Sequence, residues 1–310
     1  MHLTFLGTGS GLPAIDRNVS SLAFDVTDSG EGVWLFDCGE ATQHQILKTP
    51  IKPRKISKIF ITHLHGDHIY GLPGLLSSRA FLNGTTPVDI YAPKGLQTYI
   101  ETAFRISGTR LSYPIYYHTL TDGQVIKTSH FDIDVKELSH GITSYGFKII
   151  EHDQIGELNV KRLKEMNIAP SPVYQQIKNQ ELTILSDGRV IHQKDVVGPN
   201  KPGRVVTILG DTGPVLGLEA FVANSDVLIH EGTYDKGLAT LARQHNHSTM
   251  FEACLVAKAA DVRALIINHL SQRYDAQMLH TLEQDARLVF PATYMAYDFM
   301  TYTVAKRAIK

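Results

Sequence analysis

One short segment gathers the residue types best suited to chemistry. Thr62-His63-Leu64-His65-Gly66-Asp67-His68 directly follows a strongly apolar run. His63 and His65 are two positions apart, so their side chains share one side of an extended segment. The glycine after them lets the chain turn sharply, which directs Asp67 and His68 toward a neighbouring point. The spacing predicts two adjacent metal positions, the first served by His63 and His65 and the second by Asp67 and His68. The alternative is a solvated polar turn rich in histidine.

Further metal ligands are expected where other apolar strands end. Three strand-like runs end in a residue that can bind a metal, namely His140, Asp211 and His269. Because α/β proteins place their sites at the carboxyl ends of strands, we expect these side chains to meet at one edge. The candidate ligands are then His63, His65, Asp67, His68, His140, Asp211 and His269.

Imidazole and carboxylate ligands without thiolate favour zinc, with manganese, iron or another divalent metal as alternatives. These ligands suffice for two ions about 3.5–4 Å apart if one carboxylate bridges them. Water or hydroxide would complete the coordination, with its pKa lowered from about 15.7 towards about 7. The pattern therefore predicts a nucleophile that is available at neutral pH.

The elements that must position these ligands alternate along the chain. Strands are predicted at 3–6, 21–26, 33–36, 58–62, 88–91, 131–138, 145–150, 204–209, 227–230 and 264–268. Helices are predicted at 40–48, 71–82, 95–106, 215–223, 248–260 and 275–285. Strands that alternate with helices are typical of an α/β architecture.

Composition limits the class of protein. Among 310 residues, 30 basic and 31 acidic side chains balance, so any contact with nucleic acid must come from local patches. Two cysteines, Cys38 and Cys254, argue against a disulfide framework and fit a reducing compartment. The sequence carries neither a secretory signal pattern nor a long apolar span. We expect a soluble cytoplasmic protein.

Residues 152–203 interrupt the regular alternation of strands and helices. They carry few strand signals, several prolines and a polar middle, and a predicted strand stands on each side. We interpret the chain as a single domain, 1–310, with 152–203 inserted as a protruding arm. An ordinary surface loop is the alternative, which a length of about fifty residues disfavours.

The motif His63-Leu64-His65-Gly66-Asp67-His68 resembles the His-x-His-x-Asp-His motif of the metallo-β-lactamase superfamily. The resemblance implies an αββα sandwich of two mixed β-sheets flanked by helices, with a dinuclear centre at one sheet edge. It also implies how the ligands divide: His63, His65 and His140 hold one zinc, Asp67, His68 and His269 hold the other, and Asp211 bridges them.

Within this superfamily the chain resembles the ribonuclease Z family nearly end to end. The matching segments are Phe5-Leu6-Gly7-Thr8-Gly9-Ser10-Gly11, Leu35-Phe36-Asp37-Cys38-Gly39-Glu40, Gly71-Leu72-Pro73-Gly74-Leu75-Leu76, His230-Glu231-Gly232-Thr233, His247-Ser248-Thr249 and His269-Leu270-Ser271-Gln272-Arg273-Tyr274. The resemblance implies a homodimeric endoribonuclease with two zinc ions per subunit. Metal-activated hydroxide would remove the 3′ trailer of precursor tRNA, leaving a tRNA 3′-hydroxyl and a 5′-phosphorylated trailer.

The same resemblance implies roles in catalysis. Asp67 would accept the proton of the attacking water, unless it is only a ligand. His247, which stands at a predicted helix start and could otherwise be an ordinary surface residue, would stabilise transition-state charge or protonate the leaving 3′ oxygen. Glu231 would orient His247 through a hydrogen bond. His230 ends a strand as the ligands do, but the family pattern leaves it off the metals, in a structural role.

RNA contacts are expected at three places. Arg17 and Asn18 belong to a loop that the family uses near the tRNA 3′ end, although the family lysine of this loop is Ile15 here. Arg273 and Tyr274 could contact a phosphate or stack on a base, with an ordinary ion pair as the alternative for Arg273. The arm would grip tRNA through Lys161, Arg162 and Lys164, which could equally form a solvated helix face.

Two other functions remain open at this stage. One is a small-molecule phosphodiesterase or sulfatase on the same dinuclear scaffold. The other is a non-catalytic RNA-binding or scaffold protein that keeps metals for stability. The inserted segment and His247 favour RNA over a small-molecule substrate. The full ligand set and His247 argue against a non-catalytic protein.

Overall fold

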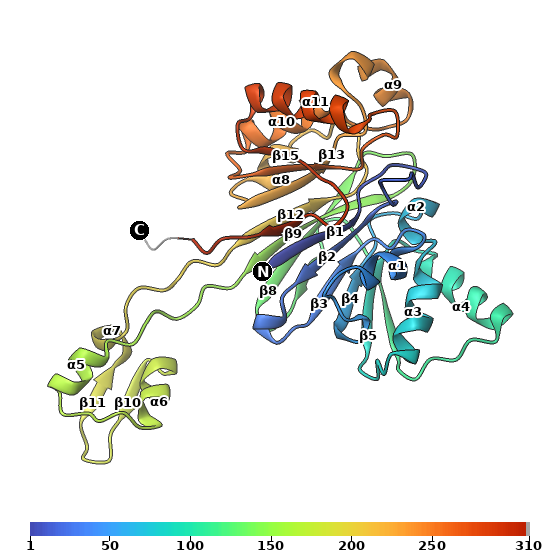
Figure 1. Ribbon diagram of the computed structural model, residues 1–310. Helices are drawn as coiled ribbons and strands as arrows, with labels where there is room; N and C mark the ends of the chain where they lie inside the picture. Colours follow the sequence, from blue (N-terminus) through green and yellow to red (C-terminus); the bar gives the residue numbers. More distant parts are fainter. Residues whose placement is uncertain (308–310) are drawn as a thin grey trace. The chain divides into compact units, whose positions relative to one another are not determined.

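Two mixed β-sheets form the centre of the computed structural model, which describes residues 1–307 (Figure 1). The first sheet has the order β16 (Thr301–Thr303), β1 (His2–Gly7), β2 (Ser21–Asp25), β3 (Val33–Phe36), β4 (Ile56–Phe60), β5 (Val88–Ala92) and β6 (Ile115–Thr119). Its strands from β16 to β3 pair antiparallel, and those from β3 to β6 pair parallel.

The second sheet has the order β15 (Thr293–Met295), β14 (Leu265–Asn268), β13 (Val227–Glu231), β12 (Val205–Leu209), β9 (Ser144–Glu151), β8 (Phe131–Leu138) and β7 (Val125–Lys127). Strands β12 to β15 are parallel, so their carboxyl ends point to the same edge. Strand β7 pairs antiparallel with β8. Because ligand-bearing residues follow β8, β12 and β14, this topology collects them at one edge.

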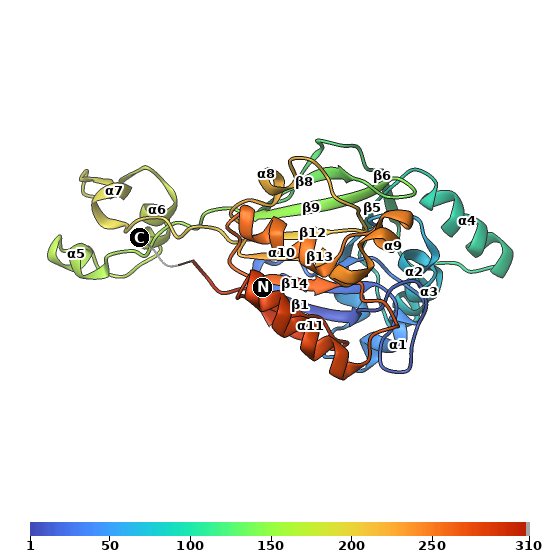
Figure 2. The same ribbon diagram turned by 90° about the horizontal axis from the view of Figure 1, so that it is seen from above.

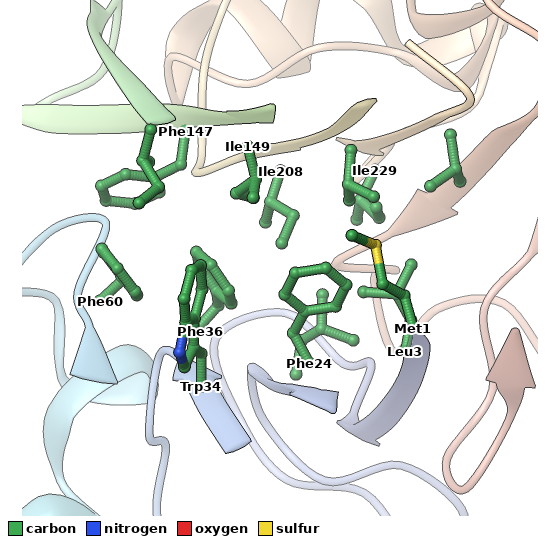
Figure 3. Packing of buried hydrophobic residues seen from close by; sticks show 14 of the residues in the cluster. Met1, Leu3, Phe24, Trp34, Phe36, Phe60, Phe147, Ile149, Ile208 and Ile229 are labelled. Carbon is green, nitrogen blue, oxygen red and sulfur yellow. The ribbon is translucent and has the colours of Figure 1, made fainter. Parts of the chain in front are cut away.

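The inner faces of the two sheets bury a shared apolar core (Figure 3). Trp34 and Phe36 extend from the first sheet toward Phe147 and Ile208 of the second, and each of these side chains is almost fully buried. The alternation along β3 follows from strand geometry, because Val33 and Leu35 point to the opposite face. There they pack in a second core, which includes residues of four helices.

Helices cover the outer face of each sheet (Figures 1 and 2). The first sheet is covered by α1 (Thr42–Leu47), α3 (Leu72–Phe81) and α4 (Leu96–Ser107), and the second by α8 (Leu218–Val222), α10 (Met250–Ala259) and α11 (Ala276–Val289). The shorter α2 (Gly66–Ile69) and α9 (Ala239–Gln244) lie in connections, as do the 3₁₀ turns η1 (Thr27–Ser29), η2 (Pro53–Lys55) and η3 (Lys236–Leu238). The four layers confirm the predicted αββα sandwich.

The structure confirms every strand and helix predicted from the sequence, with bounds that differ by a few residues. Outside residues 152–203, the prediction omitted the short helices α2 and α9 and the strands β6, β7, β15 and β16. The last three are only three residues long and lie at or next to sheet edges, where partial exposure weakens the alternation of apolar and polar side chains.

Residues Ile150–Arg204 form a second compact unit, which also includes Lys306 and Arg307. This unit contains α5 (Val160–Glu165), α6 (Val173–Asn179), the hairpin of β10 (Leu182–Ile184) and β11 (Val190–His192), and α7 (Gln193–Val196). It has a small core of its own, formed by Leu163, Ile168, Ile177, Ile191 and Val196. Within residues 1–307, no helix is both long enough and apolar enough to cross a membrane.

We expect Phe24→Ala to destabilise the larger unit by about 3–5 kcal/mol, because it opens a cavity in the core between the sheets. Phe24 is 0% exposed and meets Trp34 edge to face, with ring centroids 5.9 Å apart. Thermal unfolding measures the change. Phe81→Ala is the matched control, because Phe81 is 86% exposed and its loss should change stability by no more than about 0.5 kcal/mol.

Candidate metal centre

Three histidines from two loops form the first group of candidate ligands. His63 and His65 follow β4, and His140 follows β8. His65 Nδ1 lies 3.1 Å from His63 Nε2 and 3.2 Å from His140 Nε2. A nitrogen atom of each ring therefore points at one common position.

The second group forms on the other side of His63. Asp67 and His68 lie in the short helix α2, directly after the two histidines, and His269 follows β14 with a left-handed backbone (φ 56°). Asp67 Oδ2 lies 3.5 Å from His68 Nε2 and 3.4 Å from His269 Nε2. These three side chains can share one ion.

Asp211 lies between the two groups. It follows β12, and its Oδ2 atom lies 3.6 Å from His63 Nε2, 3.5 Å from His68 Nε2 and 3.2 Å from His269 Nε2. The carboxylate is 4% exposed. A single buried oxygen at comparable distances from both groups can bridge two cations.

Polar partners fix the second nitrogen of four of these rings. His63 Nδ1 contacts Thr62 Oγ1 at 3.0 Å, and His269 Nδ1 contacts Thr233 Oγ1 at 2.9 Å. His140 Nδ1 lies 2.9 Å from the carbonyl oxygen of Asn246, and His68 Nδ1 lies 2.7 Å from an oxygen of Asp37. Such contacts hold the ring plane and the tautomer that a metal ligand requires.

Asp37 is a residue of the site that the sequence analysis did not single out. One of its oxygens accepts from the backbone N–H of Thr62, and the other accepts from Thr62 Oγ1 and lies against His68. Its left-handed backbone (φ 57°) turns the carboxylate back toward the metal motif. An aspartate directly after the strand 33–36 was the available signal, because it repeats the pattern that drew attention to Asp211.

The residues fit divalent metal ions. Tetrahedral coordination at about 2.0–2.1 Å separates neighbouring ligand atoms by about 3.3 Å, which is close to the spacing within the first group. His65 Nδ1 meets two ring nitrogens, and a single proton cannot satisfy both contacts. His68 Nε2 is buried without a hydrogen-bond partner among the described residues. Burial holds the pKa values of His63 and His65 below the usual range, so both rings are neutral as ligands must be.

His247 and Glu231 form a hydrogen-bonded pair beside this cluster. Glu231 ends β13, and its Oε1 atom lies 2.7 Å from His247 Nδ1. The His247 ring centroid lies 5.1 Å from that of His140 and 5.4 Å from that of His269. Burial alone would lower the pKa of His247, but the hydrogen bond to Glu231 raises it to about 9. His247 is therefore placed to carry a proton next to the candidate metal positions.

Glu231 is itself fully enclosed. Burial alone would raise its pKa, but the hydrogen bond from His247 lowers it, so the carboxylate remains ionised. Backbone N–H groups of Thr212 and Thr233 also donate to it, at 3.0 and 3.1 Å. His230, the preceding residue, is buried and belongs to no group of potential metal ligands among the described residues.

Arg17 and Asn18 are engaged with the protein. Arg17 Nη1 donates to Thr8 Oγ1 and to the carbonyl oxygen of Ala296, both at 2.8 Å, and burial lowers its pKa. Asn18 Nδ2 donates to the carbonyl oxygen of Glu40. Both side chains therefore shape the loop. Its neighbour Gly11 reaches the metal cluster, where its N–H donates to Asp67 Oδ2 at 2.8 Å.

Arg273 and Tyr274 also have partners in the protein. The Arg273 guanidinium lies over the Tyr234 ring, 5.0 Å from its centroid, and Tyr274 donates its hydroxyl proton to Asp235. Tyr234 in turn meets the His247 ring edge-on at 6.0 Å, so it links Arg273 to the catalytic candidate. In the inserted unit, Lys161, Arg162 and Lys164 are exposed on α5, and Arg162 pairs with Glu165 at 3.4 Å.

Comparisons with known proteins agree with this geometry. A ribonuclease Z from Oceanobacillus iheyensis is 50% identical over 98% of this chain and 100% of its own length. One from Listeria innocua is 44% identical over 99% of this chain and 100% of its own length. Residues 1–156 match the family model described as anti-Pycsar protein Apyc1.

Comparison with solved structures also finds a tRNase Z and a protein of the metallo-β-lactamase fold. The human tRNase Z short form superposes with a TM-score of 0.71 at 28% identity, covering 98% of this chain and 100% of that one. The metallo-β-lactamase fold protein YhfI of Bacillus subtilis superposes with a TM-score of 0.68 at 19% identity, covering 97% and 98%. Fold and cluster thus define a protein of the metallo-β-lactamase fold with a candidate site for divalent metal. The chain belongs to the ribonuclease Z family and, through residues 1–156, to the family that the Apyc1 model describes.

Proposed function

We propose that this protein is an endoribonuclease that removes the 3′ trailer from precursor tRNA. The observation that carries the proposal is the identity of 50% with a ribonuclease Z over 98% of the chain. The model of anti-Pycsar protein Apyc1 spans only residues 1–156, so it leaves out His247, Asp211 and His269. The reaction is hydrolysis of one phosphodiester bond, which leaves a 3′-hydroxyl on tRNA and a 5′-phosphate on the trailer.

The proposed cofactor is a pair of zinc ions. His63, His65 and His140 would hold one, Asp67, His68 and His269 would hold the other, and Asp211 would contact both. When bound, such ions neutralise charge on the phosphoryl oxygens and lower the pKa of water toward neutrality. The ring-nitrogen spacing and the unpartnered His68 Nε2 support this assignment.

The chain itself would move two protons. Asp67 Oδ2 accepts a hydrogen bond from Gly11 N–H, which holds the carboxylate where it can take a proton from the attacking water. His247, held by Glu231 through Nδ1, can deliver a proton from Nε2 to the leaving 3′ oxygen. His247 with its raised pKa is protonated at neutral pH, as a general acid must be.

Contacts away from the reaction centre would select the RNA. We assign the inserted unit to tRNA binding, with Lys161, Arg162 and Lys164 as phosphate contacts, because all three are exposed on one short helix. Asn18, Arg17, Arg273 and Tyr274 would then act by shaping the loops beside the metal cluster. A homodimer and a cytoplasmic location complete the proposal, and the two free cysteines, Cys38 and Cys254, fit a reducing compartment.

Incubation of the purified protein with labelled precursor tRNA tests the function. We expect one cut at the start of the trailer, with the 5′-phosphate on the trailer fragment. A chelator should abolish the cut and added zinc should restore it. Cleavage at scattered positions, or cleavage that resists the chelator, would contradict the proposal.

Deleting 152–203 should abolish precursor tRNA cleavage and spare turnover of a small chromogenic phosphodiester. Glu151 N–H donates to Arg204 O at 2.8 Å, so a short Gly-Ser linker can join the two ends. Replacing Lys161, Arg162 and Lys164 by alanine is the finer variant. It should raise KM for precursor tRNA. It should also reduce the slope of log binding constant against log salt concentration by up to about three, if each side chain contacts a phosphate. If the deletion variant kept full activity on both substrates, the assignment of residues 152–203 to tRNA binding would be wrong.

Asp37→Asn should lower metal affinity about 10–100-fold, because it removes the charge that orients His68 and Thr62 without removing a ligand. Titration with a zinc buffer measures the affinity. Asp261→Asn is the control, since Asp261 is exposed on the loop after α10 and asparagine tolerates its left-handed backbone (φ 50°). An unchanged zinc affinity in Asp37→Asn would leave Asp37 with a purely structural role.

A further inference from the structure

A cavity of about 390 Å³ lies next to the metal cluster and has no role in the mechanism above. It is lined by Leu64, Pro93, Lys94, Thr119, Leu120, Ile142, Thr143 and Tyr145. Its volume lies in the range of sites that bind small organic groups, about 300–1,000 Å³. The cavity can therefore accept a group much larger than a water molecule or a single ion.

The cavity shares two loops with the first group of candidate ligands. Leu64 stands between the candidate ligands His63 and His65, and Ile142 follows His140 by two positions. At the turn after Lys94, a Cβ at Gly95 would lie 3.4 Å from Leu64 Cδ1. A group held in the cavity would therefore lie near the loops that carry the first group of candidate ligands, within reach of an RNA chain bound at the cluster.

The walls are mostly apolar and are held by hydrogen bonds. Tyr145 donates its hydroxyl proton to the carbonyl oxygen of Leu120 at 3.2 Å, and the N–H of Leu120 donates to Ala92 O. Tyr145 N–H donates to Thr62 O, which ties this wall to the metal loop. Hydroxyls of Thr119 and Thr143 add polar groups at the rim, because both residues are exposed. Apolar walls with a few polar groups suit a flat ring with polar edges.

Lys94 supplies the only charge among the lining residues. It is exposed, and no carboxylate lies within 4.0 Å of it among residues 1–307. It also lies two residues before Leu96, the first residue of α4, and the N-terminal end of this helix carries partial positive charge. This arrangement attracts an anion to the rim of an apolar cavity, and a nucleotide combines these two features.

We propose that the cavity holds a nucleobase of the RNA trailer, with Lys94 facing the phosphate beyond it. The inference rests on the proposed function. An RNA chain that crosses the metal cluster must leave it on two sides, and the loop carrying Gly11 borders the side of Asp67. The cavity is lined by the neighbours in sequence of the first ligand group, Leu64 between His63 and His65 and Ile142 after His140. Trailer bases are single-stranded and can leave the stack to enter a cavity, whereas the acceptor side continues into a paired stem.

Ile142→Trp tests the proposal by filling the cavity with an indole. We expect KM for precursor tRNA to rise about tenfold with kcat unchanged, because a stacked base contributes binding energy of this order. Lys94→Ala should raise KM severalfold and reduce the salt slope of binding by about one. Ile106→Trp and Lys258→Ala are matched controls on exposed positions outside the cavity lining, and both should behave as wild type.

Substrates with an abasic nucleotide identify the base. An abasic first trailer nucleotide should raise the wild-type KM to that of Ile142→Trp, and the two proteins should then be equal. Unchanged KM in Ile142→Trp, or an equal penalty on normal and abasic trailers, would overturn the proposal. If the KM values of the wild type and Ile142→Trp became equal only when the last tRNA nucleotide is abasic, the cavity would hold a base of the acceptor end. That result would also overturn the proposal. Wild-type protein that leaves precursor tRNA intact would instead overturn the proposed function, since the variants are compared only after wild-type cleavage is established.

Discussion

Asp211→Asn should abolish both precursor tRNA cleavage and small-phosphodiester turnover, by a factor of about a thousand or more. Its Oδ2 atom lies 3.2–3.6 Å from ring nitrogens of His63, His68 and His269. Asparagine keeps the size of the side chain but loses the negative charge that the two proposed cations would need between them. Without this charge the transition state would lose several kcal/mol of stabilisation, which corresponds to a loss of rate by a factor of about a thousand.

Two measurements separate this effect from a folding defect. Elemental analysis should find less than the wild-type metal content, and thermal unfolding should become insensitive to added zinc, because a ligand that binds the folded state raises its stability. Asp261→Asn, an exposed change of the same chemistry, should retain full activity and metal content. Full activity of Asp211→Asn would show that the Asp211 carboxylate has no role in the proposed metal centre.

The sequence predicted the positions of these candidate ligands because each follows a strongly apolar strand. A histidine or aspartate at the end of an apolar run stands out, because a buried strand would continue with apolar residues. Asp211 and His269 can therefore be recognised from the sequence alone. The parallel order of β12, β13 and β14 then brings the strand ends to one edge. The ligand roles stay predictions, but the structure gathers all these side chains in one cluster.

The partners of the ligands could not be predicted in the same way. Thr233 holds His269, and the carbonyl oxygen of Asn246 holds His140, yet threonine and a backbone carbonyl occur throughout the chain. Their identity depends on how loops far apart in sequence meet. Arg17 shows the same limit, because its acceptor Ala296 lies 279 positions away. From the sequence alone, a basic residue in a loop suggests an RNA contact. Only the fold reveals that Arg17 has an acceptor within the protein, the carbonyl oxygen of Ala296.

The inserted unit was foreseen as an interruption but not as a folded element. Its helices have four to seven residues and its strands three, which is too short for a clear hydrophobic period. Leu163, Ile177 and Ile191 come from three such elements and form a core only when these have folded together. Tertiary packing, rather than local propensity, therefore defines this unit.

His247→Ala should reduce kcat for precursor tRNA by about 10²–10⁴-fold, the usual contribution of a general acid. His247 Nδ1 lies 2.7 Å from Glu231 Oε1, so the pair is expected to act as a unit. Glu231→Gln should therefore cause a smaller loss, and the double variant should be no slower than His247→Ala alone. His245→Ala is the matched control, since His245 is exposed two positions away and should leave kcat unchanged.

Metal content decides between two interpretations of that loss. His247 also lies close enough to His140 and Asp211, and to Glu231 and His269, to count as a potential ligand itself. If His247 acts as the acid, the variant should keep the wild-type metal content. A substrate whose leaving oxygen is replaced by sulfur should then be cleaved almost as fast by the variant as by the wild type, because a thiolate leaves without protonation. A variant that loses metal and cleaves both substrates slowly would instead make His247 a ligand, and the second proton transfer would need another residue.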